Sequence, residues 1–133
     1  EKAIRDIPGP LSKVLLEHDR RSVLERAREY ILSRWGEYYE AIFSNQVLLE
    51  LTAKGSNKGG MVEELARRLG IGAEHIYCVG DNENDIPMLA VSAIPFAPAN
   101  CAPEVKQWGA RILGACEESC VAQIVDILDH IYA

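Results

Sequence analysis

Apolar and polar positions in the first half of the chain predict a strand, a helix and a hairpin. The apolar run at residues 14–16 has the length of a short strand. Between residues 21 and 35, apolar side chains recur every three or four positions, which predicts a helix that ends at Gly36. Residues 38–43 and 47–51 alternate apolar and polar side chains around a short polar turn, the pattern of a β-hairpin.

A glycine-rich loop, residues 55–60, leads into a second half in which short apolar runs alternate with helical patterns. Strands are predicted at residues 76–79, 92–96 and 111–113, and helices at residues 61–69, 86–90, 103–108 and 117–131. This alternation predicts an α/β fold in which helices pack on the faces of a parallel sheet. In the first and last helices, the positions expected to face inward are Val62, Leu65 and Leu69, and Val121, Ile124, Val125, Leu128 and Ile131.

Composition and charge narrow the class of protein. Apolar residues make up 48% and charged residues 26% of the 133 positions, as in ordinary globular proteins. The net charge of −6 argues against nucleic acid or an anionic membrane as a partner. No apolar run approaches the roughly 20 residues that cross a bilayer. The four cysteines lack metal-site spacing, so we expect no zinc and a reducing, cytoplasmic setting.

Candidate chemistry lies where the predicted strand 76–79 ends. Gly80 breaks the apolar run, Asp81 follows it, and Asp85 comes four positions later where the next helix begins. Ligands of open α/β sheets bind just beyond the carboxyl ends of the strands, and Mg²⁺ prefers carboxylates, water and substrate phosphate. Asp81 is equally suited to a turn and Asp85 to a helix N-cap, so both interpretations stay open.

Two further polar residues take comparable positions. Lys58 opens the helix at residues 61–69, where its ammonium group and free backbone N–H groups would both face an anion. The alternative for Lys58 is a solvated side chain at a flexible joint. Asn100 follows the strand at residues 92–96 and so belongs to the same sheet edge as Asp81. The alternative for Asn100 is a loop residue that bonds its own backbone.

Three stretches, in this order along the chain, resemble haloacid dehalogenase (HAD) superfamily phosphatases of the Cof-type branch, subfamily IIB. Lys58-Gly59 resembles the step that opens the helix of the third motif. Residues 80–89, with the sequence GDNENDIPML, resemble the fourth motif. Asn100-Cys101, followed by Val105-Lys106, resembles an Asn-Ala step and a Val-Lys helix, with cysteine in place of alanine.

The resemblance implies a role for each candidate residue. Asp81 and Asp85 would hold Mg²⁺ directly or through water, and the metal would neutralise the transferring phosphoryl group. Lys58 would stabilise the same charge. Asn84 and Asn100 would orient phosphate oxygens or the metal-bearing loop. The implied substrate is a small phosphorylated metabolite.

The resemblance also implies a division of the chain. Residues 54–133 would be the C-terminal part of a Rossmann-like, HAD-like core. Residues 1–53, with a strand, a helix and a hairpin, would be part of an αβ cap module that closes over the site and selects the substrate.

Covalent catalysis in the family depends on an Asp-x-Asp motif that supplies the nucleophile and the general acid. The aspartates here occupy positions 6, 19, 81, 85, 126 and 129, and no two are separated by a single residue. We therefore expect the C-terminal portion of a Mg²⁺-dependent phosphatase, inactive alone. Two alternatives are a non-catalytic Mg²⁺- or phosphate-binding or interaction module, and one half of a split enzyme. A third is a generic α/β fold in which the acidic loop is structural.

The same resemblance predicts how the chain assembles. In the family, the strand that bears the nucleophile lies beside the strand that ends at the fourth motif. Without that neighbour, residues 76–79 would form an apolar sheet edge whose unpaired N–H and C=O groups invite another strand. We therefore expect self-association through this edge.

Overall fold

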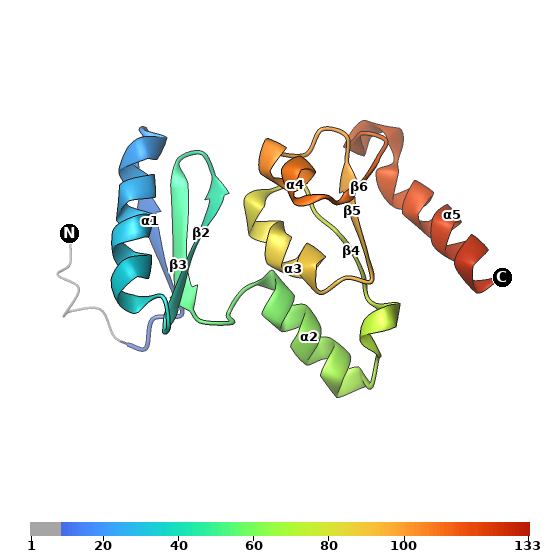
Figure 1. Ribbon diagram of the computed structural model, residues 1–133, viewed down its shortest axis with the longest axis horizontal. Coiled ribbons are helices and arrows are strands. Elements are labelled where there is room, and N and C mark those ends of the chain that lie inside the picture. The colour runs from blue at the N-terminus through green and yellow to red at the C-terminus, as the bar shows by residue number, and fades with distance from the viewer. Residues whose placement is uncertain (1–8) are drawn as a thin grey trace. The chain divides into compact units, whose positions relative to one another are not determined.

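The computed structural model describes residues 9–133, and the chain divides into two compact units between Lys54 and Gly55. Residues 1–8 of the predicted cap module lie outside the described residues, and Asp6 is among them. Figure 1 shows an antiparallel sheet with one helix in the first unit, and a parallel sheet with several helices in the second. Each unit has a buried apolar cluster of its own.

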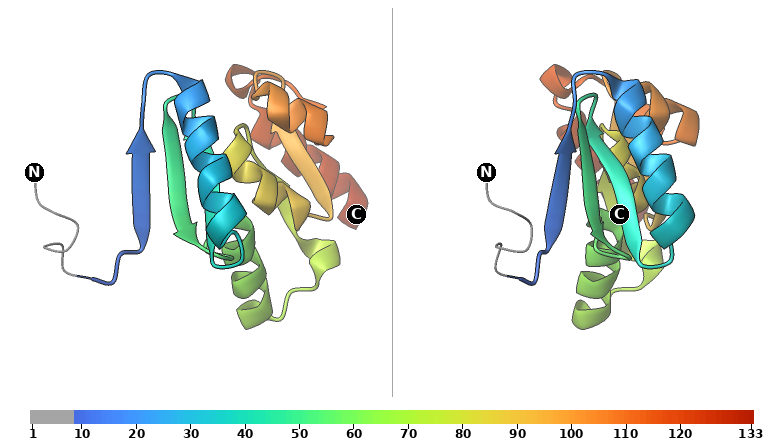
Figure 2. Two further views of the ribbon diagram at one scale, coloured as in Figure 1. Left: turned by 60° about the vertical axis from the view of Figure 1, so that its left-hand side comes forward. Right: turned by 90° about the vertical axis from the view of Figure 1, so that its left-hand side faces the viewer.

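The first unit is a three-stranded sheet with one helix against it. Its elements are β1 (Lys13–Glu17), α1 (Arg21–Trp35), β2 (Tyr39–Asn45) and β3 (Leu48–Ala53). The strand order is β1-β3-β2, and both pairings are antiparallel. Helix α1 covers one face of this sheet, as the two views of Figure 2 show.

Alternation along the hairpin explains which face of this sheet is buried. Ala41 of β2 is opposite Leu51 of β3, and Phe43 is opposite Leu49, so all four side chains share one face. Leu24 of α1 packs into the same cluster. The predicted strand, helix and hairpin are therefore present, and the helix has the predicted bounds.

The second unit alternates strands and helices. Its elements are α2 (Lys58–Leu69), β4 (Tyr77–Val79), α3 (Ile86–Ala90), β5 (Ile94–Pro98), α4 (Pro103–Trp108), β6 (Arg111–Leu113) and α5 (Cys120–Tyr132), with short 3₁₀ turns η2 (Ala73–His75), η3 (Glu83–Asp85) and η4 (Cys116–Glu118). The strands are parallel in the order β4-β5-β6. The predicted α/β fold with a parallel sheet is confirmed.

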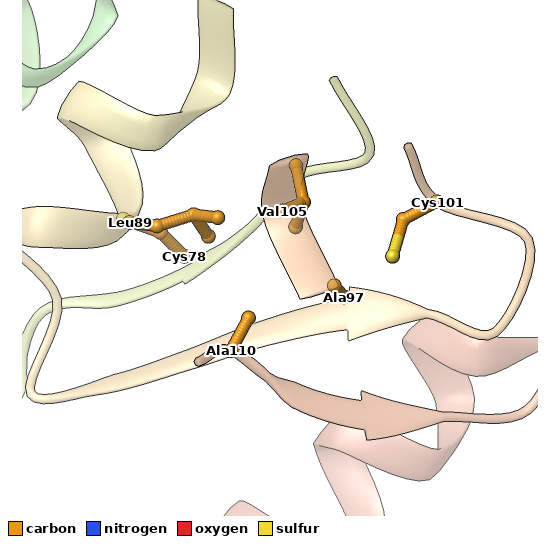
Figure 3. Close-up of a cluster of buried hydrophobic side chains, with 6 residues drawn as sticks. All are labelled: Cys78, Leu89, Ala97, Cys101, Val105 and Ala110. Atoms are coloured by element: carbon orange, nitrogen blue, oxygen red, sulfur yellow. The ribbon is translucent and has the colours of Figure 1, made fainter. Parts of the chain in front are cut away.

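The core of the second unit lies on one face of its sheet. Figure 3 shows Leu89 of α3 and Val105 of α4 above Cys78 of β4 and Ala97 of β5, with α5 on the opposite side of the strands. Leu89 and Val105 are fully buried. Val62 of α2 packs against the same cluster.

The absence of a side chain at Gly59 allows α2 to pack close to α3. A Cβ atom at Gly59 would lie 2.2 Å from the carbonyl oxygen of Pro87, a contact that only glycine avoids. This close approach places the first turn of α2, with Lys58, against η3 and α3. The Lys-Gly step therefore has a packing role in addition to any role in binding.

The predicted inward faces of α2 and α5 are partly wrong. In α2, Val62 packs inward and Ala66 is buried, but Leu65 and Leu69 are exposed. In α5, Ile124 is buried and Leu128 is half-buried, whereas the exposed residues are Val121, Val125 and Ile131. Both helices carry an apolar surface that is wider than this small sheet covers.

Candidate active site

The candidate residues gather at the carboxyl edge of the parallel sheet, where three loops are tied together. The N–H of Gly80, after β4, donates to the carbonyl of Phe96 at 3.1 Å. The N–H of Ala102, after β5, donates to the carbonyl of Asp81 at 2.8 Å. These backbone bonds hold the loop that follows β4 against the strand and loop of β5.

Asp85 is the buried charged residue of this edge, with 4% of its surface exposed. Its Oδ2 accepts hydrogen bonds from the N–H groups of Asp81, at 2.9 Å, and Asn82, at 3.1 Å. Its Oδ1 forms an ion pair with the ammonium group of Lys58. Both oxygens of the Asp85 carboxylate therefore have partners inside the protein.

These partners keep Asp85 ionised although it is buried. Burial alone raises the pKa of the carboxyl group, but the hydrogen bond from Lys58 and the two backbone N–H bonds outweigh it, so the pKa lies below its ordinary value of 3.8. A charge-assisted bond to a buried carboxylate is stronger than a neutral one. Asp85 is thus a fixed negative charge at neutral pH.

Gly80 makes room for this arrangement. A Cβ atom at Gly80 would lie 2.3 Å from the Cβ of Asp85. Any larger residue would push the carboxylate away from the N–H groups that it binds, so Gly80 does more than end the strand.

Asp81 and Asn84 flank the buried carboxylate. Asp81 is exposed, and its backbone is held through both its N–H and its carbonyl group. Asn84 is half-buried in η3, and within residues 9–133 its side chain has no hydrogen-bond partner. The Asp81 carboxylate and the Asn84 amide are therefore the oxygen groups that the fold leaves available here.

Asn100 takes part in a different contact. Its Oδ1 accepts a hydrogen bond from the N–H of Cys116 at 3.2 Å, which ties the loop after β5 to the loop after β6. Asn100 and Asp81 share the sheet edge, but no direct contact joins their side chains in the described residues; Ala102 connects the two loops.

The oxygen ligands at this edge provide only part of a binding site for a hard cation such as Mg²⁺. Carboxylate and amide oxygens are ligands that Mg²⁺ accepts, and Asp81, Asn84 and Asp85 supply them from one loop. Asp85, however, is already shared with Lys58. Among the residues that the structure describes, no group of three His, Cys, Asp or Glu side chains is placed to hold a metal. These residues fit one side of a magnesium site, which solvent and phosphate oxygens would complete.

Fold and site together define an α/β protein whose charged groups meet at the carboxyl edge of a parallel sheet. The sequence profile of haloacid dehalogenase-like hydrolases matches residues 3–125. The chain therefore belongs to this family, as its motifs predicted. Among curated relatives, a protein of Streptococcus pyogenes serotype M6 with the name "Putative phosphatase" is 31% identical over 107 residues. That alignment covers 80% of this chain and 40% of the relative.

Solved structures agree with the fold. A haloacid dehalogenase-like hydrolase from B. subtilis matches 91% of this chain with a TM-score of 0.80 at 24% identity. A subclass IIB sugar phosphatase matches 89% with a TM-score of 0.73 at 22% identity. The chain spans 42% and 43% of these two proteins, so it corresponds to less than half of each.

The ion pair between Lys58 and Asp85 was not predicted from the sequence. The two residues are 27 positions apart, and both were assigned separately to phosphate and metal. Asp85 occupies the N-cap position of α3, but its side chain makes no cap bond to that helix, so the N-cap interpretation is wrong. Its carboxylate instead accepts the N–H of Asn82 as the N3 residue of the capping box of η3, and the N–H of Asp81. Asn57 was also missed as the N-cap of α2, where its Oδ1 accepts the N–H of Gly60 at 2.9 Å.

We expect Asp85 to make stability depend on acid. Because its pKa is lowered on folding, its stabilisation is present above the ordinary value of 3.8 and is lost as the pH falls through the folded pKa. Asp85→Asn should lower the free energy of unfolding at pH 7 by about 1–3 kcal/mol, since it leaves buried donors without a charged partner. Urea denaturation between pH 7 and pH 2, followed by circular dichroism, measures both effects.

Asp126→Asn removes an exposed carboxylate from α5 and is the matched control. It should leave the stability at pH 7 and its decline in acid nearly unchanged. Equal acid sensitivity of Asp85→Asn and the parent chain would contradict the role assigned to Asp85.

Proposed function

We propose that this chain supplies the metal- and phosphate-binding edge of a Mg²⁺-dependent phosphatase for small phosphate monoesters. The observation that supports this most is the buried, ionised Asp85, held between Lys58 and the backbone of Asp81. It fixes a lysine and an exposed carboxylate at the sheet edge where ligands of α/β proteins bind. Membership of the family and the name of the streptococcal relative favour the same function.

Each residue has a distinct part in this proposal. Asp81 and Asp85 would hold Mg²⁺ directly or through water, and Asp85 also positions the loop and pairs with Lys58. Bound Mg²⁺ supplies charge neutralisation for the phosphoryl oxygens. Lys58 is half exposed at the start of α2, so its ammonium group can contact a phosphate without leaving Asp85. Asn84 and Asn100 orient phosphate oxygens or the loops that carry the site.

We also propose that the first unit is part of a cap module and that this module selects the substrate. Within residues 9–133, no helix is long and apolar enough to cross a membrane. All four cysteines are free thiols, which favours a reducing compartment, and we place the protein's function in the cytoplasm.

We predict weak binding of Mg²⁺ that phosphate strengthens. Mg²⁺ gives up its water reluctantly and usually needs a substrate phosphate beside one or two carboxylates. Calorimetric titration of Mg²⁺ should give little heat alone and clear binding in the presence of inorganic phosphate. Asp81→Asn should weaken that binding about 10- to 100-fold, as loss of a coordinating or supporting group does.

Asp126→Asn serves again as a control for the same change of charge at an exposed position of α5. It should bind Mg²⁺ and phosphate like the parent chain. Tight Mg²⁺ binding without phosphate, or equal weakening by both variants, would overturn the assignment of Asp81.

We also propose that the chain alone does not hydrolyse phosphate esters. Its metal and lysine groups can stabilise charge, but no Asp-x-Asp pair is present to form the covalent intermediate. Purified chain with Mg²⁺ and an aryl phosphate should release no phosphate above background. Turnover that survives repurification and is lost in Asp81→Ala would show that this proposal is wrong.

A second proposal concerns assembly with another copy of the chain. Among the described strands, β4 is one edge of the parallel sheet. Helix α2 of the same unit exposes Met61, Leu65 and Leu69 at four-residue intervals, which is a single stripe on the helix. Two β4 edges are identical and can pair about a two-fold axis, so a second copy satisfies the N–H and C=O groups of both edges.

We predict that association of the chain depends on β4. Val79→Lys places a charge on this edge and should shift the chain towards monomer in light scattering across a concentration series. Ile112→Lys makes the same change on β6, the opposite edge, and should leave association intact. A parent chain that stays monomeric at high concentration would exclude the second copy as the occupant of β4.

A further inference from the structure

The loop after β6 brings two cysteines together. Cys116 opens the turn η4 and Cys120 opens α5. Between them, Ser119 adopts a left-handed conformation with φ 57°, and its N–H donates to the carbonyl of Cys116 at 3.2 Å. The turn is held by a bond of 2.8 Å from the N–H of Ala115 to the carboxylate of Glu118. This turn brings Cys120 close enough to Cys116 to contribute to the raised pKa of the Cys116 thiol.

The two thiols differ in access to solvent. Cys116 is exposed, whereas Cys120 is buried with 5% of its surface exposed. An oxidant in solution therefore reaches Cys116, while Cys120 lies beside it and is shielded. The other two cysteines, Cys78 and Cys101, are buried in the core beneath α3 and α4.

Asn100 holds the exposed member of the pair. Its Oδ1 accepts the backbone N–H of Cys116 at 3.2 Å. The cysteine pair is thus attached to a candidate residue of the sheet edge.

We propose that Cys116 and Cys120 form a reversible oxidation site that closes to an intramolecular disulfide with a hydroperoxide as oxidant. The Cys116 thiolate attacks the peroxide, breaks its O–O bond, becomes a sulfenic acid and releases hydroxide or alkoxide. The Cys120 sulfur then attacks the Cys116 sulfur, an S–S bond forms, and water leaves with the sulfenic oxygen and the thiol proton. Two thiols are oxidised by two electrons and one peroxide is reduced.

The surroundings of Cys116 determine how fast it reacts. Protein atoms that displace water from the thiol, together with the neighbouring Cys120 and Glu117, raise the pKa of Cys116, and the side chain of Asn100 acts in the opposite direction. Since the thiolate is the reactive form, oxidation is slow at neutral pH and should rise about tenfold per pH unit below the thiol pKa.

Trypsin makes the test specific. Cleavage after Arg111 releases residues 112–133, which contain Cys116 and Cys120 but no lysine or arginine. Cleavage after Arg68 and Lys106 releases residues 69–106, which contain Cys78 and Cys101. The folded chain is treated with hydrogen peroxide, alkylated and digested, and alkylation of both peptides is measured by mass spectrometry.

We expect the peptide 112–133 to lose two hydrogens and both alkylation sites together, and dithiothreitol to restore them. The peptide 69–106 should keep both thiols. In Cys120→Ser, dimedone should trap the sulfenic acid at Cys116, and Cys78→Ser should oxidise at positions 116 and 120 like the parent chain.

Three results would overturn the proposal: two free thiols in the peptide 112–133 after treatment, oxidation of Cys116 beyond the sulfenic acid without disulfide, or a disulfide between chains. Phenylarsine oxide, which bridges two adjacent thiols, is a second measurement that needs no variant. Retention of one arsenic per parent chain on Cys116 and Cys120 supports the pair, and no retention contradicts it. None of these readouts depends on phosphatase activity.

Discussion

The ion pair between Asp85 and Lys58 is the interaction on which the second unit depends most. A buried carboxylate is costly unless donors surround it, and here the donors come from α2 and from the loop after β4. The pair therefore joins two segments 27 residues apart while the backbone of Asp81 is fixed beside them. Gly59 and Gly80 permit this because larger residues at either position would clash with Pro87 or with Asp85 itself.

The arrangement separates a positioning charge from an exposed one. Both carboxylate oxygens of Asp85 bind partners inside the protein. The carboxylate of Asp81 is exposed, and hydrogen bonds to its backbone N–H and carbonyl groups hold its backbone in place. Because the loop is already ordered, the exposed carboxylate of Asp81 can bind a ligand at a lower entropic cost. The family's two aspartates are therefore physically unequal in this chain, although their sequence motif treats them alike.

Residue pattern was sufficient for the elements and for the edge where the candidate site lies. Periodicity placed α1, α4 and β6 at their observed bounds, because each is bordered by glycine, proline or polar residues that end regular structure. The ion pair between Lys58 and Asp85 could not be predicted from the sequence, because no local pattern indicates a contact between residues 27 positions apart. The inward faces of α2 and α5 were partly misjudged because helical spacing shows which residues are apolar, not how much sheet lies beneath them. Likewise, the bond from Cys116 to Asn100 depends on the neighbouring loops of two parallel strands.

The strand order of the second unit has a consequence for how it folds. Since β4, β5 and β6 are neighbours both along the chain and in the sheet, each pairing joins strands that follow one another in sequence, and only the segment between them has to close. The sheet can therefore grow strand by strand from its N-terminal side, as the chain leaves the ribosome. In that order Asp81 and Asp85 come first, but the amide of Asn100 acquires its partner only when the segment around Cys116 has been made. The polar edge is thus complete only when β4, β5 and the loop after β6 are all present.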